Sequence, residues 1–238
     1  MKKALRSIQT IVTGHYGTGK TEFSVNLALG LAAAGRRTIM ADLDIVNPYF
    51  RSRECRGNLE RVGIRLIASS QKCSDADVPA LLPDVLSIFE DRTICGVMDI
   101  GGDPAGARVL AQFQPKITEE DYQLIFVSNA NRPEVRTAQK ALEYLRGIEA
   151  VTGLTCGGMI NNTHLCGETT PAEVLRGAEL AKELSALTGI PVLAHMAERA
   201  ITEELNSLRE LVFPITIQMK KPWERVASRP NMKGEQRI

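Results

Sequence analysis

Gly14-His15-Tyr16-Gly17-Thr18-Gly19-Lys20-Thr21 matches the pattern G-x-x-x-x-G-K-[ST] at every fixed position. The glycines permit backbone dihedral angles that are closed to other residues, so consecutive N–H groups can turn toward one anion. In this pattern Lys20 binds the β- and γ-phosphates of a nucleotide, and the Thr21 hydroxyl binds Mg²⁺. The stretch predicts a phosphate-binding loop, to which we assign every residue from Gly14 to Thr21 and the adjoining Glu22.

The sequence on either side of this loop supports that interpretation. Residues 8–13 are a short β-branched run, as expected of a buried strand. After the loop, apolar residues recur at helical spacing from Phe23 to Ala34, and Gly35 is a natural helix stop. A strand, a glycine-rich turn and a helix N-terminus direct the positive end of the helix dipole at the phosphates.

Composition is typical of one α/β domain, which we expect to span residues 1–238 with a polar tail from about residue 220. Apolar residues make up 44% of the 238 and charged residues 24%, and the formal net charge of +1 gives no field that recruits DNA. The five cysteines are odd in number and form no C-x-x-C pair, which favours reduced thiols in the cytoplasm. We find no secretory signal, membrane span or membrane-anchoring amphipathic helix.

Acidic residues follow two of the predicted strands. Asp42 and Asp44 end the strand 37–41, and because they are two residues apart they point the same way. Asp99 ends the strand 93–99 and is followed by two glycines, of which Gly102 is assigned to the γ-phosphate. The carboxyl edge of a parallel sheet is where ligands bind, so we interpret Asp99 to Gly102 as a nucleotide-sensing switch loop.

Two further segments are candidates for recognition. Residues 48–53 mix aromatic side chains with Arg51 and Arg53. This segment either contacts a partner or the phosphates, or its aromatic side chains pack in the ordinary way and its arginines are solvated. The strand 154–160 ends in Asn161 and Asn162, and a side-chain amide can both donate to and accept from an adenine edge. GTPases typically place an aspartate three residues after such an asparagine. Here that place holds His164, so we predict ATP as the nucleotide.

Strands and helices alternate through the chain, which predicts an α/β fold with a mostly parallel sheet of about seven or eight strands and helices on both faces. We expect Pro133 in the first turn of a helix, a short helix at residues 201–211, and an edge strand at residues 213–219. With its loop, its acidic pair and its switch in this order, the chain resembles the MinD/ParA/nitrogenase-iron-protein (SIMIBI-class) superfamily of P-loop ATPases over residues 8–210.

This resemblance implies roles for the residues at the matching positions. Asp44 would orient the attacking water, Asp42 and Asp99 would support Mg²⁺ through water, and Asn161 or Asn162 would contact adenine. Lys20 and Asp44 are thus the catalytic candidates. The metal candidates are Thr21, Asp42 and Asp99. Members often form homodimers with ATP at the interface.

The chain also departs from the superfamily pattern. His15 stands where many members carry a signature lysine that reaches the partner subunit's phosphates, and Arg51 or Arg53 could replace that cation. No cysteine lies between Cys95 and Cys156, where the iron-protein branch binds its cluster. A metal site at Cys73, or at Cys166 with His164, stays open. The membrane-targeting tail and DNA-binding helices of some members are missing.

The favoured interpretation is a slow Mg²⁺-dependent ATPase that acts as a switch for a protein client, with a homodimer as its expected form. One alternative is an ATP-dependent kinase or ligase for a small molecule, of the dethiobiotin-synthetase type. Others are an ATPase for metal or cofactor maturation, and a nucleotide-dependent binding module without turnover.

Overall fold

The computed structural model describes residues 9–44, 55–68 and 78–219. Their strands form one eight-stranded sheet in the order β3-β2-β4-β1-β5-β6-β7-β8, in which every neighbouring pair is parallel. The bounds are β1 (Gln9–Thr13), β2 (Thr38–Leu43), β3 (Arg65–Ala68), β4 (Cys95–Ile100), β5 (Tyr122–Ser128), β6 (Cys156–Asn161), β7 (Val192–Glu198) and β8 (Val212–Ile215). The predicted fold class is confirmed. The last strand lies at the edge of the sheet as predicted, but it ends at Ile215 rather than at residue 219.

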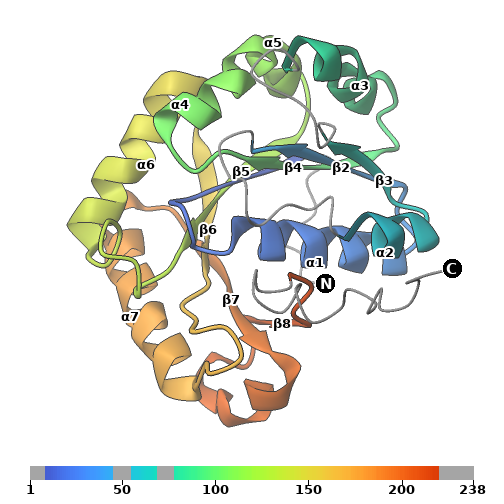
Figure 1. The fold of residues 1–238 in the computed structure, drawn as a ribbon. Coiled ribbons are helices and arrows are strands. Elements are labelled where there is room, and N and C mark those ends of the chain that lie inside the picture. The colour runs from blue at the N-terminus through green and yellow to red at the C-terminus, as the bar shows by residue number, and fades with distance from the viewer. Residues whose placement is uncertain (1–8, 45–54, 69–77, 220–238) are drawn as a thin grey trace, which may run out of the picture.

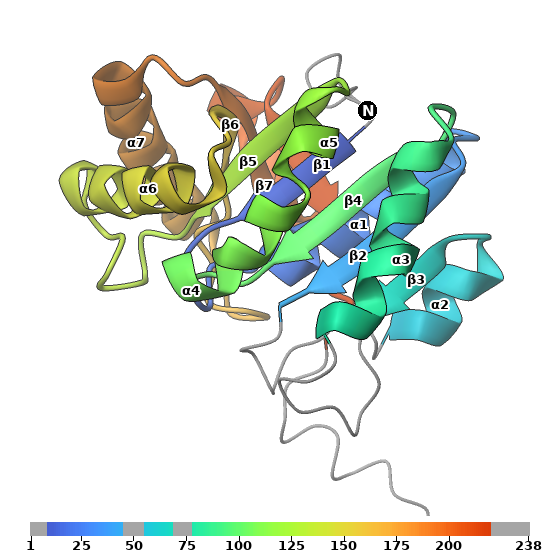
Figure 2. The same ribbon diagram turned by 90° about the horizontal axis from the view of Figure 1, so that it is seen from above.

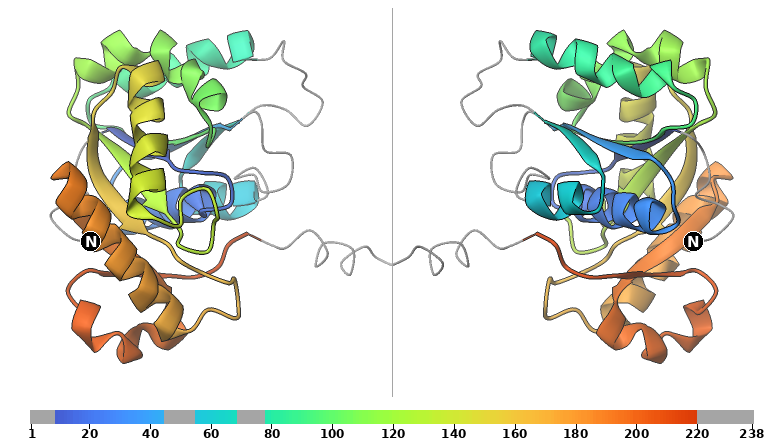
Figure 3. Two further views of the ribbon diagram at one scale, coloured as in Figure 1. Left: turned by 90° about the vertical axis from the view of Figure 1, so that its left-hand side faces the viewer. Right: turned by 90° about the vertical axis from the view of Figure 1, so that its right-hand side faces the viewer.

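Helices cover both faces of the sheet (Figure 1). One face carries α1 (Lys20–Ala33) and α2 (Arg56–Arg61), which lie side by side beneath the strands (Figure 3). The other face carries α3 (Val78–Glu90), α4 (Pro104–Ala107), α5 (Gln114–Thr118), α6 (Ala138–Thr152) and α7 (Pro171–Thr188) (Figure 2). Consecutive parallel strands need crossover connections, and helices in these connections cover both faces of the sheet.

The core is divided by the sheet into two layers. Strands β1, β2 and β4 are buried along their whole length, as expected for central parallel strands with helices above and below. Ile11, Met98 and Phe126 pack toward α3 to α7, whereas Val12 and Met40 pack with Phe23 of α1 on the opposite face. Cys95 and Cys156 lie within these clusters, which confirms that they pack as small apolar side chains.

The central position of β1 determines where a ligand can bind. Its neighbours β4 and β5 lie on opposite sides of it, so the connections from β1 and from β5 leave the sheet in different directions. A crevice forms at such a point beyond the carboxyl ends of the strands. In the register of the sheet, Asp99 of β4 pairs with Val12 of β1 on one side and Asp42 of β2 on the other.

Two predicted helices differ from the structure. The helix after β5 begins at Ala138 because Thr137 caps it by accepting from the Lys140 N–H, so Pro133 lies in the preceding loop rather than in the first turn. Residues 199–208 form two 3₁₀ segments, η4 (Arg199–Glu204) and η5 (Asn206–Leu208), in place of a short α-helix; a third, η3, spans Arg108–Gln112. No helix in the described ranges has the length and apolar character needed to cross a bilayer.

Candidate functional site

The loop between β1 and α1 folds back on itself as the motif predicts. The Thr18 N–H and hydroxyl both donate to the His15 carbonyl, at 3.2 and 2.9 Å, which closes a tight turn. Gly19 has φ of +83°, and a Cβ on it would lie 2.1 Å from the Asn162 amide nitrogen. Gly14, with φ of +145°, packs equally closely on the backbone of Val127. Only glycine fits at these two positions, because a side chain would be strained and would collide.

Helix α1 begins without a side-chain cap. Its N-cap residue is Gly19, which has no side chain to accept from the first N–H groups. The other long helices whose N-cap lies in the described residues do have side-chain caps, because Thr137 caps α6, and Thr170 with Glu173 forms a capping box at α7. The first N–H groups of a helix need an acceptor, and an anion at this position would supply it.

Lys20 is buried close to the acidic pair that follows β2. Its side chain is 4% exposed, and its Nζ lies 3.9 Å from Asp44 Oδ2. The Asp44 N–H donates to Asp42 Oδ1 at 3.2 Å, which holds the Asp42 carboxylate against the backbone of Asp44 just beyond the end of β2. The structure therefore brings the predicted catalytic pair, Lys20 and Asp44, together.

Asp99 is a fully buried carboxyl group whose two oxygens make no hydrogen bond of normal geometry within the described part of the chain. Burial raises its pKa to about 8, and the negative charges of Asp42 and Asp44 act in the same direction, whereas Lys20 and the Thr21 hydroxyl partly offset them. An unpaired buried carboxylate beside a threonine hydroxyl suits Mg²⁺, which prefers oxygen ligands and takes one or two carboxylates plus substrate phosphates. Thr21, Asp42 and Asp99 thus fit the predicted metal role.

The two glycines after β4 lie where the switch was predicted. A Cβ on Gly101 would lie 2.7 Å from the Gly106 Cα, and one on Gly102 would lie 2.8 Å from Lys20 Nζ and 3.0 Å from the Tyr16 nitrogen. Asp103 then caps α4 by accepting from the Gly106 N–H. The backbone of Gly102 consequently lies directly against the phosphate-binding loop.

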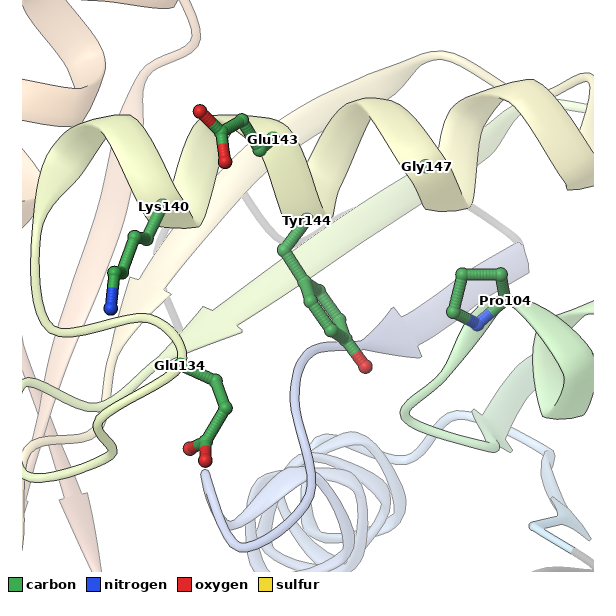
Figure 4. A pocket seen from close by; sticks show the side chains of 6 residues that line it. All are labelled: Pro104, Glu134, Lys140, Glu143, Tyr144 and Gly147. Carbon is green, nitrogen blue, oxygen red and sulfur yellow. The ribbon is translucent and has the colours of Figure 1, made fainter.

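His15 packs inward, against α6. Its ring meets Tyr144 edge-on at a centroid distance of 5.1 Å, and its Nδ1 contacts the Tyr16 carbonyl at 3.0 Å and lies 3.9 Å from Glu134. Tyr144 extends from α6 toward the loop and forms one wall of a cavity of about 430 Å³ (Figure 4). The other lining residues are Pro104, Glu134, Lys140, Glu143 and Gly147.

The two asparagines at the end of β6 face different surroundings, and the structure removes Asn161 from the predicted role of contacting adenine. Its side chain is fully buried, its Nδ2 donates to the Val174 carbonyl, and its Oδ1 accepts from the N–H and hydroxyl of Thr163. Asn162 instead donates to the Thr18 carbonyl at 2.8 Å. Of the pair, only Asn162 touches the phosphate-binding loop.

Glu22, which we assigned to the phosphate-binding loop, has a side chain with partners of its own. Its carboxylate accepts from the N–H groups of Gln218 and Met219 and from Asn26, and burial raises its pKa above the ordinary value. The side chain therefore anchors the segment after β8. At the phosphates, Glu22 can contribute only its backbone.

Arg132 and His164 adjoin the loop as well, and sequence reasoning had not placed them there. Arg132 Nε donates to the Gly17 carbonyl at 2.8 Å. His164 accepts at Nδ1 from the Cys166 N–H, and its buried Nε2 has no partner among the described residues. Burial lowers the pKa of His164 to about 4, so the ring is neutral at pH 7. Both residues follow strands at the carboxyl edge of the sheet, and this position in the sequence is the feature that could have identified them as site residues.

Several predicted residues lie outside the described part of the chain, namely residues 48–53 with both arginines, Cys73, and the tail from residue 220. Cys166 is exposed. Within residues 9–44, 55–68 and 78–219 there is no group of three or more His, Cys, Asp or Glu side chains that could hold a metal ion. A metal site that includes Cys73 therefore stays a prediction.

Known structures share this fold. FtsY of Thermotoga maritima matches with a TM-score of 0.53 and 18% identity, over 77% of this chain and 59% of that one. The signal recognition particle receptor FtsY of Elizabethkingia anophelis, in complex with GDP, matches with a TM-score of 0.51 and 17% identity, over 81% and 57%. A nucleotide-binding protein from Archaeoglobus fulgidus, in complex with ADP, gives a TM-score of 0.48 and 17% identity, over 84% and 86%.

The chain therefore shares its α/β fold with the FtsY structures, and it spans less than two thirds of the FtsY chains that it matches. No family model and no curated protein matches the sequence.

Proposed function

We propose that this chain is a single-domain, Mg²⁺-dependent nucleoside triphosphatase that works as a conformational switch, with ATP as its preferred nucleotide. The observation that carries the proposal is the uncapped start of α1 at Gly19, with Lys20 buried beside it. A helix of 14 residues that leaves its first N–H groups to an external acceptor, next to a buried cation, is suited to a phosphate chain.

Three side chains are proposed to hold Mg²⁺ beside the phosphates. The Thr21 hydroxyl would be a direct ligand, and Asp42 and Asp99 would act through water. The ion would neutralise phosphate charge. It would also resolve the burial of Asp99, whose carboxylate lacks a hydrogen-bond partner in the described residues.

Asp44 is proposed to orient the attacking water. Its carboxylate lies 3.9 Å from Lys20 Nζ, so it is adjacent to the cation that would bind the γ-phosphate. Water positioning is a contribution that the residue can make without being protonated, as in other nucleoside triphosphatases.

The preference for adenine rests on the residues after β6. Recognition of guanine typically uses an aspartate three residues after the asparagine, and those places hold His164 after Asn161 and Leu165 after Asn162. Neither side chain has a carboxylate: leucine is apolar, and the imidazole of His164 is neutral at pH 7 because burial lowers its pKa to about 4. The FtsY structure in complex with GDP makes GTP the competing candidate.

A protein client and an ATP-dependent homodimer remain part of the proposal, following the resemblance to MinD and ParA. The inward packing of His15 on Tyr144 means that this residue does not reach across to a second subunit in the described conformation. A homodimer would therefore draw its trans-acting cation from another residue, for which Arg51 and Arg53 are the proposed candidates. Turnover without the client is expected to be slow.

A second candidate is phosphoryl transfer to a small molecule, which the cavity beside Tyr144 favours. It is about 430 Å³ in volume, large enough for a metabolite, and it adjoins the phosphate-binding loop. This candidate predicts that small metabolites, rather than proteins, stimulate ADP release.

The hydrolytic role is tested by measuring phosphate release and nucleotide retention for the wild type and Asp44→Asn. We expect the variant to bind ATP with Mg²⁺ but to lose at least tenfold in turnover, since the residue that positions water contributes in the transition state. Asp91→Asn is the matched control, because Asp91 pairs with Arg37 on the surface, outside the site. Equal turnover in Asp44→Asn and wild type would contradict the proposed role, and tighter binding of GTP than ATP would contradict the base assignment.

A further inference from the structure

Tyr144 contacts two functional segments at once. Its ring packs edge-on against His15 of the phosphate-binding loop, at 5.1 Å between centroids and 70° between planes. Its hydroxyl donates to the Gly102 carbonyl in the switch loop. The side chain projects from α6 into the space between these segments (Figure 4). A single residue of a neighbouring helix therefore joins the loop and the switch.

The hydrogen bond from Tyr144 determines the position of the Gly102 peptide. A Cβ on Gly102 would lie 2.8 Å from Lys20 Nζ and 2.7 Å from the Gly14 carbonyl oxygen. The Gly102 peptide consequently borders the place where Lys20 would bind the last phosphate of a triphosphate. A small movement of this peptide changes the room and the hydrogen bonds available to the γ-phosphate, but it leaves the α- and β-phosphate contacts at the start of α1 unchanged.

The Tyr144 hydroxyl is a permanent donor in this environment. Burial raises the pKa of the phenol above its ordinary value, and the nearby carboxylates of Asp103, Asp44 and Glu134 raise it further. The hydroxyl therefore keeps its proton at neutral pH. Carbonyl oxygens only accept, so the direction of the hydrogen bond is unambiguous.

We propose that Tyr144 is a positioning residue of the nucleotide switch, which holds the Gly102 peptide against the phosphate-binding loop so that the site distinguishes triphosphate from diphosphate. This inference rests on the proposed function, because it assumes that the loop binds a nucleoside triphosphate. The hydroxyl acts through the backbone of Gly102 and does not itself touch the phosphates. Its removal should weaken triphosphate binding selectively.

The test compares the wild type with Tyr144→Phe, which keeps the ring on His15 and removes only the hydroxyl. Calorimetry measures the dissociation constants of a non-hydrolysable ATP analogue and of ADP, both with Mg²⁺. One neutral hydrogen bond corresponds to about a three- to tenfold change in affinity, so we expect the analogue to bind about that much more weakly and ADP to bind as before. Tyr122→Phe is the matched control, since its hydroxyl accepts from the Thr155 N–H at 3.3 Å, outside the site.

The outcomes separate this inference from the proposed function. If the wild type binds neither nucleotide, the proposed function fails. If the wild type binds both, and Tyr144→Phe weakens both equally or neither, the positioning role is overturned while the proposed function stands. Thermal unfolding of each variant identifies a general loss of structure, which would lower both affinities together.

Discussion

Replacing Gly102 by alanine tests the close approach of the switch loop to the phosphate-binding loop. The added methyl group would lie 2.7 Å from the Gly14 oxygen, 2.8 Å from Lys20 Nζ and 3.0 Å from the Tyr16 nitrogen. Two of these three atoms belong to the backbone, and Gly14 is itself pressed against Val127, so the phosphate-binding loop has little room to retreat. The switch loop must move away instead.

The size of the effect follows from that displacement. Overpacking by one methyl group costs about 1–3 kcal/mol where neighbours cannot give way. Binding of a triphosphate would require Gly102 to approach the loop again, so we expect affinity to fall by about 5- to 150-fold, which is the same free energy expressed as an equilibrium constant. Affinity for a diphosphate should change much less.

Gly147→Ala is the control. Gly147 lies inside α6, and a Cβ there would meet only Pro104 Cγ, at an ordinary 3.7 Å. Alanine is favoured over glycine in a helix interior, so this variant should gain about 0.5–1 kcal/mol of stability and keep wild-type affinity. Calorimetry with a non-hydrolysable triphosphate, together with urea unfolding, measures both quantities. Wild-type triphosphate affinity in Gly102→Ala would refute the proposed contact between switch and phosphate.

Two further predictions concern buried titratable groups. Asp99→Asn should raise the stability of the nucleotide-free protein, because it removes a buried carboxyl with like charges nearby, and it should weaken the Mg²⁺ dependence of nucleotide binding. Thermal unfolding measures the first effect, and calorimetry with and without Mg²⁺ measures the second. Lower stability of the variant with an unchanged Mg²⁺ dependence would mean that Asp99 is merely structural. His164 has a pKa lowered from 6.5 to about 4, so its contribution to stability is present above pH 6.5 and is lost as pH falls through 4. Between pH 6.5 and pH 4 the unfolding free energy of the wild type should fall by up to about 3 kcal/mol relative to that of His164→Gln. Parallel pH profiles of unfolding free energy for the two proteins would contradict this prediction.

Much of the architecture was predictable because local patterns and topology agree. The β-branched run before Gly14, the helical spacing after it, and the repeated alternation of strands and helices together imply a parallel sheet covered on both faces. Parallel strands also place their carboxyl ends at one edge, which puts Asp42 and Asp99 on the same side of the sheet, and in the structure the two residues pair.

The remaining features depend on contacts that no local pattern carries. Asn161 and Asn162 are adjacent, so their side chains point to opposite sides of a strand, and only the packing of α7 decides which one reaches the loop. Tyr144 meets Gly102 across 42 residues of sequence. The start of α6 was misassigned because Pro133 suits a first turn, whereas the actual cap is Thr137.

The central claim is that the turn from β1 into α1 binds a nucleoside triphosphate through Lys20. The most direct measurement is calorimetric titration of ATP with Mg²⁺ into the wild type and into Lys20→Ala. The account predicts saturable binding by the wild type and at least a tenfold loss in the variant, because the buried ammonium group would otherwise contact the phosphates. Absence of binding by the wild type to both ATP and GTP, or equal affinity in Lys20→Ala, would contradict it.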